Sequence, residues 1–147
     1  AAALRTARNN ARRNDVEDRV SFEDLDIAAS RLDGLDSSPF DCVISTPPSV
    51  TAAEWDSLPP EIRDHEPRRA LAGGDAGLDF YPHIIQKSPP VLRGGGMLLV
   101  EVGSGQSGAV AELFAAQGFT EIIIFPDLNG IPRAVRGIWG EGAEDHN

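Results

Sequence analysis

Polar residues follow three apolar segments of this sequence, at the point where each segment ends. In an open α/β sheet, ligands bind beyond the carboxyl ends of the strands. Hydroxyls, carboxylates and backbone carbonyls at such ends can hold and orient a ligand by hydrogen bonds. The three groups are Asp26 after Arg19–Phe22, Ser45–Pro48 at the end of the run that begins at Phe40, and Glu101–Gly103 at the end of the run that begins at Met97.

Metal and disulfide chemistry find no support in the sequence. The three histidines, His65, His83 and His146, show no spacing typical of a zinc site, so we predict no metal. The single cysteine, Cys42, cannot form an internal disulfide and lies in an apolar run. We therefore expect a small buried side chain in a protein from a reducing compartment.

The elements that must position these groups alternate between helix and strand, which predicts an α/β sheet. Phe40–Ser45 is an apolar, β-branched run that must end at Pro47-Pro48, because proline cannot donate to a sheet ladder. Met97–Val102 reads as a fully buried strand, typical of a parallel sheet. Further strands are predicted at Arg19–Phe22, Glu121–Phe125 and Arg133–Trp139, the last two joined by the turn Asp127–Gly130 into an antiparallel hairpin.

Helices are predicted from apolar residues at helical spacing. The predicted helices cover residues 2–14, ending at Asn14 and Asp15; Leu78–Leu92, capped by Asp75 and split by Pro89-Pro90; and Gln106–Gln117, ended by Gly118. Loops are expected over residues 28–39 and at Gly94–Gly96, and residues 140–147 form a polar tail. The polar stretch Ser49–Gly74 has few regular signals, and so long a loop usually has a function or is disordered.

Size and charge limit the classes of function. A chain of 147 residues has the size of one domain, and no apolar stretch approaches the ~20 residues of a membrane span. The net charge of −10 argues against nucleic-acid binding, which needs a basic surface. The same charge fits a basic partner surface, or simply solubility.

Several motifs, in order along nearly the whole chain, resemble those of the release-factor glutamine N5-methyltransferases. Ile44–Ser49 occupies the place of the strand–Asn/Asp-Pro-Pro-Tyr/Phe motif, which methyltransferases acting on planar nitrogen share. Residues 65–81, HEPRRALAGGDAGLDFY, are similar to the more specific EP–AL–GG–GL–Y signature of this family. Residues 94–106, GGGMLLVEVGSGQ, and residues 127–135, DLNGIPRAV, resemble its next two blocks.

The resemblance implies a class I methyltransferase (Rossmann-like) α/β sheet with an antiparallel C-terminal hairpin, lacking its first two strands. Residues 1–139 would be a partial S-adenosylmethionine-dependent methyltransferase domain, followed by the tail 140–147. The implied reaction moves a methyl group from S-adenosylmethionine to the glutamine amide nitrogen of a peptide-chain release factor, within its GGQ loop. The implied protein is an intracellular monomer, mitochondrial in a eukaryote and cytoplasmic in a bacterium, with no membrane or nucleic-acid partner.

The same resemblance assigns the site residues. Thr46 and Pro47 would be catalytic, Thr46, Pro47, Pro48, Ser49 and Glu66 would bind the substrate, and Asp26 and Thr46 would bind the cofactor. Each position also has a plainer interpretation. Asp26 could be a solvated turn carboxylate, Thr46–Pro48 a turn that ends a strand, Glu66 part of a surface loop, and Tyr81 a core residue.

Two departures from the family pattern leave the activity of the chain open. Thr46 replaces the family's asparagine and Ser49 its aromatic residue, and the family's glycine-rich cofactor loop has no counterpart within the 147 residues. An inactive truncated homologue that acts at most as a protein-binding module is therefore the alternative interpretation. A nucleic-acid amino-methyltransferase is a third, disfavoured by the acidic charge.

Overall fold

The computed structural model describes residues 2–30, 32 and 39–140. The chain divides into two compact units, residues 1–30 and residues 31–147, and each is described by itself. The loop predicted over residues 28–39 lies partly, and the tail after Gly140 entirely, outside the described residues.

The first unit is built on helix α1 (Ala2–Arg13), which confirms the predicted amphipathic helix. Ala11 on its apolar face is buried. The helix ends where Asn14 donates its side-chain amide to the Asn10 carbonyl at 2.8 Å and Asp15 turns into the left-handed region at φ 53°. Residues with short polar side chains adopt this region more readily than others, so the chain leaves the helix here.

The strand predicted at Arg19–Phe22 is not formed. Glu17–Arg19 is instead a turn of 3₁₀-helix (η1), and Val20 follows in extended conformation without belonging to a sheet. Alternation of apolar residues shows which face of a strand would be buried, but a strand also needs a neighbour to pair with its backbone groups. None of the described residues supplies that neighbour, and the Val20 side chain is 43% exposed.

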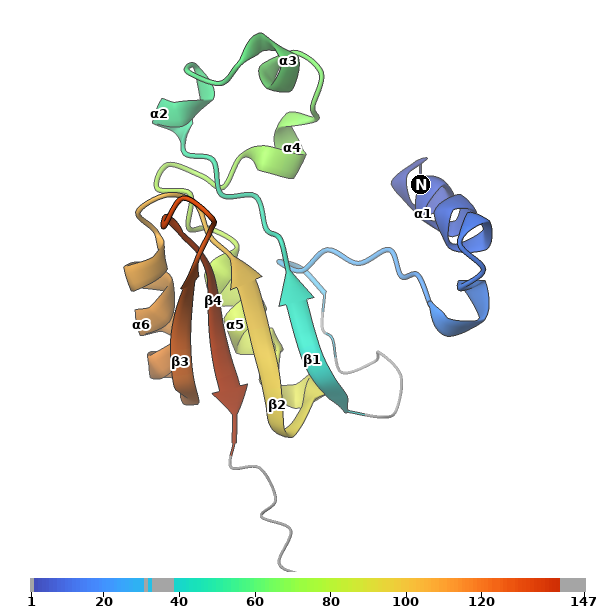
Figure 1. Ribbon diagram of the computed structural model, residues 1–147, viewed down its shortest axis with the longest axis vertical. Coiled ribbons are helices and arrows are strands. Elements are labelled where there is room, and N and C mark those ends of the chain that lie inside the picture. Colours follow the sequence, from blue (N-terminus) through green and yellow to red (C-terminus); the bar gives the residue numbers. More distant parts are fainter. Residues whose placement is uncertain (1, 31, 33–38, 141–147) are drawn as a thin grey trace, which may run out of the picture. The chain divides into compact units, whose positions relative to one another are not determined.

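The second unit is a four-stranded sheet in the order β1 (Phe40–Ser45), β2 (Leu92–Glu101), β4 (Pro132–Trp139), β3 (Phe119–Pro126) (Figure 1). β1 and β2 run parallel, and β4 runs antiparallel to both of its neighbours. The predicted α/β sheet with an antiparallel closing hairpin is confirmed. The hairpin is placed so that β4, the last strand in the chain, lies between β2 and β3.

Helices α5 (Tyr81–Lys87) and α6 (Ser107–Gln117) pack against one face of this sheet (Figure 1). Leu98 and Val100 of β2 face them and are fully buried. Met97 and Leu99 alternate with these residues and are only half-buried. The prediction of a fully buried strand therefore holds for one face of β2 only, because within this unit the helices cover a single face.

Two element boundaries differ from the prediction. The helix predicted over Leu78–Leu92, with Asp75 as its cap, begins only at Tyr81. Gly77, which lies between the predicted cap and Leu78, has a φ of 71° that no helix accommodates. The helix ends before a 3₁₀ turn at Pro89–Val91 (η2), as the two prolines require. The glycines at 94–96, predicted as a turn, lie inside β2 as an irregularity where the register with β1 shifts.

The long polar stretch after β1 contains three one-turn helices, α2 (Ala52–Trp55), α3 (Pro60–Arg63) and α4 (Arg68–Leu71). Thr51 and Glu54 form a capping box at the start of α2, a pattern visible in the sequence as Thr-x-x-Glu. An isolated parallel β-bridge between Val50 and Ala72 joins the beginning of this stretch to its end. None of the helices in the described ranges is long and apolar enough to cross a membrane.

Candidate functional site

The sheet brings two of the three predicted strand-end groups together. β1 and β2 are parallel neighbours with Ser45 opposite Val100, so Thr46–Ser49 leaves the sheet beside Glu101–Gly103. This is the edge at which an open α/β sheet binds its ligands. The third group, Asp26, belongs to the first unit.

A buried glutamine joins the two segments. Gln106, 7% exposed, precedes α6 as its N-cap residue. Its side-chain nitrogen donates to the Ser49 carbonyl at 2.8 Å and, at 3.4 Å, to the Ala76 carbonyl. Its side-chain oxygen accepts from the Gly103 backbone N–H at 2.9 Å. One side chain therefore ties the segment after β1 to the turn after β2.

Tyr81 extends this connection to the end of β2. Its hydroxyl lies 3.1 Å from the Glu101 carbonyl and 3.0 Å from the Gln106 side-chain oxygen, and the residue has no exposed surface. Burial raises the pKa of the Tyr81 hydroxyl, although hydrogen bonds donated to its oxygen by the Gly103 backbone and the Ser49 side chain oppose that shift. Tyr81 thus stays protonated and remains a donor. Tyr81 is the core residue that its helical spacing predicted, and its hydroxyl also connects the Gln106 side chain to the end of β2.

Two glycines let the chain approach the proline segment closely. A methyl group on Gly73 would lie 2.6 Å from the Pro48 carbonyl oxygen. A methyl group on Gly77 would lie 2.2 Å from the Ser49 carbonyl oxygen and 2.3 Å from the Gln106 nitrogen. Both distances are far below van der Waals contact, so only glycine fits without movement. This is a physical reason for the Gly-Gly and Gly-Leu pairs of residues 73–78.

The segment that this framework holds is open to ligands at its start. Thr46 is exposed, and Pro47, Pro48 and Ser49 are half-buried. Glu66 is exposed in the turn between α3 and α4. Neither the polar network nor the glycines bring Glu66 to Thr46, so its assignment to the substrate stays a prediction.

Asp26 takes part in a local turn. Its side-chain oxygen accepts from the Ala28 backbone N–H at 2.8 Å, and its carbonyl accepts from Ser30 at 2.7 Å. The carboxylate is exposed. The geometry is that of the plainer interpretation, a turn carboxylate, and the cofactor role of Asp26 stays a prediction.

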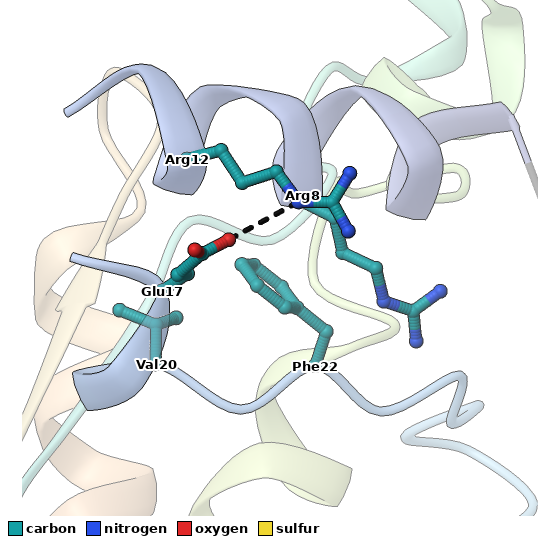
Figure 2. A pocket seen from close by; sticks show the side chains of 5 residues that line it. All are labelled: Arg8, Arg12, Glu17, Val20 and Phe22. Carbon is teal, nitrogen blue, oxygen red and sulfur yellow. Dashed lines mark hydrogen bonds and ion pairs between the residues drawn. The ribbon is translucent and has the colours of Figure 1, made fainter. Parts of the chain in front are cut away.

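A separate hollow of about 280 Å³ lies within the first unit (Figure 2). An ion pair between Arg12 and Glu17, 3.1 Å long, lines it together with Val20 and Phe22, and the Arg8 guanidinium lies 6.0 Å from the Phe22 ring. Figure 2 shows the Phe22 ring pointing toward α1. Both members of the ion pair are more than half exposed, so the pair adds little stability. No predicted site residue lines this hollow.

In the sequence, Gln106 stands out only as the start of a predicted helix and as the last residue of the block 94–106 that resembles the family. The signal that could have marked it is a long polar side chain directly before an apolar helix and after a glycine turn. Its burial and its partners 57 residues away are decided by the fold.

Comparison with known proteins identifies the class. No protein-family model matches the sequence. The chain is 39% identical over 135 residues to a release factor glutamine methyltransferase of Geobacter sulfurreducens, covering 92% of this chain and 45% of the relative. It is 41% identical over 136 residues to the protein of the same name from Caulobacter vibrioides, covering 92% of this chain and 46% of the relative. The chain thus spans slightly less than half the length of these curated relatives.

A solved structure, a release factor-specific protein-(glutamine-N5) methyltransferase from Alicyclobacillus acidocaldarius, is also similar, with 26% identity and a TM-score of 0.47 over 82% of this chain and 66% of that one. This sequence similarity places the chain in a family of methyltransferases. The chain belongs to the family of the release factor glutamine methyltransferases.

Proposed function

We propose that this chain forms the part of a methyltransferase that binds the methyl acceptor. The reaction transfers a methyl group from S-adenosylmethionine to a glutamine amide nitrogen of a peptide-chain release factor. The observation that carries the proposal is the Thr46–Ser49 segment, held by Gln106 at the carboxyl edge of a parallel strand pair. It stands within a chain of which 92% matches relatives named for this activity.

The chemistry needs positioned hydrogen-bond acceptors. An amide nitrogen is a poor nucleophile, because its lone pair is delocalised into the carbonyl group. Acceptors on its N–H bonds orient the nitrogen toward the methyl group, and holding reactants in line removes much of the barrier. We assign this role to the Pro47 carbonyl and the Thr46 hydroxyl, with Pro48 and Ser49 completing the substrate contact.

The described residues fit the acceptor end of the site better than the cofactor end. When bound, S-adenosylmethionine supplies an electrophilic methyl group. The exposed Asp26 carboxylate has the chemistry to accept from its adenine amino group, and Thr46 could contact its methyl-bearing end. The Gly103 backbone N–H, which could otherwise donate to an anionic group of a ligand, already donates to the Gln106 side-chain oxygen.

Thr46 weakens the acceptor group. A threonine offers one hydroxyl, whereas an asparagine offers an acceptor oxygen and two donor hydrogens at longer reach. Loss of one such positioned contact typically costs ~10²–10³ in rate. A chain that binds release factor without methylating it is therefore the second candidate, and Thr46 and Ser49 are the observations that favour it.

A transfer assay separates the two candidates. The 147-residue chain is incubated with a GGQ-containing release factor and methyl-labelled S-adenosylmethionine, with a release factor lacking that glutamine as the control. Label on the glutamine supports the enzyme, whereas binding of release factor without label supports the binding module. Calorimetry with S-adenosylmethionine adds a direct test, because the absence of heat would reject activity of the chain on its own.

Thr46→Asn tests the role assigned to the threonine. This substitution should raise the transfer rate by about 10²- to 10³-fold, since it restores the missing contact. An unchanged rate in a folded variant would show that Thr46 does not limit the reaction.

A further inference from the structure

Gln106 is a buried polar side chain that connects four groups, the Tyr81 hydroxyl and backbone groups of Ser49, Ala76 and Gly103, without itself reaching the exposed Thr46. We propose that Gln106 is a positioning residue, which fixes the Pro47–Ser49 backbone relative to the end of β2. The functional part of this inference rests on the proposed methyl transfer. The positional part does not, and it is tested separately.

The side chain has a single compatible orientation. Its nitrogen faces the carbonyls of Ser49 and Ala76, and its oxygen faces the Gly103 N–H and the Tyr81 hydroxyl. An amide group has two donor hydrogens and two acceptor lone pairs, so each of the four partners matches a position on it, with the single Tyr81 hydroxyl hydrogen shared between the Gln106 oxygen and the Glu101 carbonyl. A flipped amide would place oxygen against carbonyl oxygen, and the network therefore defines one position for Ser49.

Fixing Ser49 also constrains Pro47. Only Pro48 separates the two residues, and a proline ring locks its φ near −65°. The Pro48 carbonyl oxygen in turn lies against Gly73, where a methyl group would approach to 2.6 Å. Few free torsions therefore remain to absorb a displacement of the Ser49 carbonyl before it reaches the Pro47 carbonyl, the proposed acceptor. A misplacement of about 1 Å can lower a rate by about 10²-fold.

Two substitutions separate positioning from general stabilisation. Gln106→Leu removes every hydrogen bond of the side chain. Gln106→Glu keeps acceptor oxygens for Gly103 and Tyr81 but, once ionised, has no hydrogen to donate to Ser49. Gln86→Leu is the matched control, because Gln86 is an exposed glutamine of α5 in the same unit.

Amide hydrogen exchange by NMR provides the first readout. The Val50 and Gly73 amides bond to Leu71 and Val50 at 2.9 Å each and report on the segment directly after Ser49. In both Gln106 variants we expect these amides to exchange about tenfold faster, the effect of losing one hydrogen bond. The exchange rates of the Leu98 and Val100 amides in the sheet should be unchanged in both Gln106 variants. In the Gln86→Leu control, the Val50 and Gly73 amides should also exchange at the wild-type rate. Unchanged Val50 and Gly73 amides, or equal acceleration throughout the sheet, would overturn the proposal.

The pH dependence provides a second readout that a purely structural role would not produce. When protonated, the carboxyl group of Gln106→Glu can again donate to the Ser49 carbonyl. Lowering the pH should therefore shift the Val50 and Gly73 amide signals back toward their wild-type positions in Gln106→Glu but not in Gln106→Leu. The same behaviour in both variants would count against the proposal.

In the transfer assay, kcat should fall by about 10²-fold in both variants while KM changes much less. If the wild-type chain transfers no methyl group, the proposed function fails, and the exchange experiment still decides the role of Gln106. If it does transfer and the variants match it, positioning by Gln106 is wrong although the function stands.

Discussion

Replacing Gly77 with alanine tests the close approach on which the candidate site depends. Gly77 has a φ of 71°, in the left-handed region that disfavours side chains. An added methyl group would lie 2.2 Å from the Ser49 carbonyl oxygen and 2.3 Å from the Gln106 nitrogen, in the middle of the hydrogen bond that joins them.

The two effects can be sized separately. Left-handed backbone costs a residue other than glycine about 1–2 kcal/mol. Relieving the clash requires the Gln106–Ser49 hydrogen bond to open, and a buried group left without its partner costs about 1–3 kcal/mol. Gly77→Ala should therefore lower the free energy of unfolding by about 2–5 kcal/mol, a large part of the ~5–15 kcal/mol that holds a typical domain folded.

Urea unfolding followed by circular dichroism measures this loss, and the chain offers a matched control. Gly105 has a similar φ of 76°, but a methyl group there would meet no atom within 4 Å. Gly105→Ala should therefore show only the backbone term of about 1–2 kcal/mol. If Gly77→Ala destabilises no more than Gly105→Ala, the packing of Gly77 on Ser49 and Gln106 does not hold the segment.

Three further predictions concern other parts of the second unit. Gly108→Ala, at an open position of α6, should stabilise the chain by about 0.5–1 kcal/mol in the same assay, and destabilisation would contradict the open space found there. Asp127 has its pKa lowered from 3.8, first by the hydrogen bond from the Ile131 N–H, so its stabilising effect is present above 3.8 and is lost as the pH falls through the lowered value. Asp127→Asn should accordingly flatten the fall in unfolding free energy below pH 3.8, and an unaltered slope would contradict this. Thr51→Ala should weaken the α2 cap by about 1 kcal/mol, seen as faster exchange of the Glu54 amide, and unchanged exchange would show that the capping box is not formed in solution.

The sequence by itself determined the elements whose signals are local. Proline stops β1 after Ser45, as Pro47-Pro48 predicted, and Gly118 ends α6 at a φ of 99°. The Asp127–Gly130 turn joins β3 to β4 as predicted, with the Asp127 carboxylate accepting from Asn129 and Ile131. Each of these signals depends on residues within about one turn of each other, so it can be read along the chain.

The family motifs were also visible in the sequence, but their physical reason was not. The Gly73-Gly74 pair suggested a loop, and the apolar spacing after it suggested a helix over Leu78–Leu92 capped at Asp75. In the structure Gly73, Gly77 and Tyr81 serve the proline segment instead, and α5 begins only at Tyr81. Local capping preference was overridden because the glycine turns pack against a segment about 25 residues earlier in the chain.

Only the tertiary structure decided which strands pair and which polar groups are buried. The pattern of Arg19–Phe22 suits a strand, yet no described neighbour pairs with it, and β4 lies between two strands that precede it in the chain. Gln106 looks like an ordinary helix-start residue until the fold places Ser49, Gly103 and Tyr81 around its amide. A strand ladder and a buried hydrogen-bond network form between groups that are far apart in the sequence. Local sequence patterns do not indicate which of these distant groups will meet.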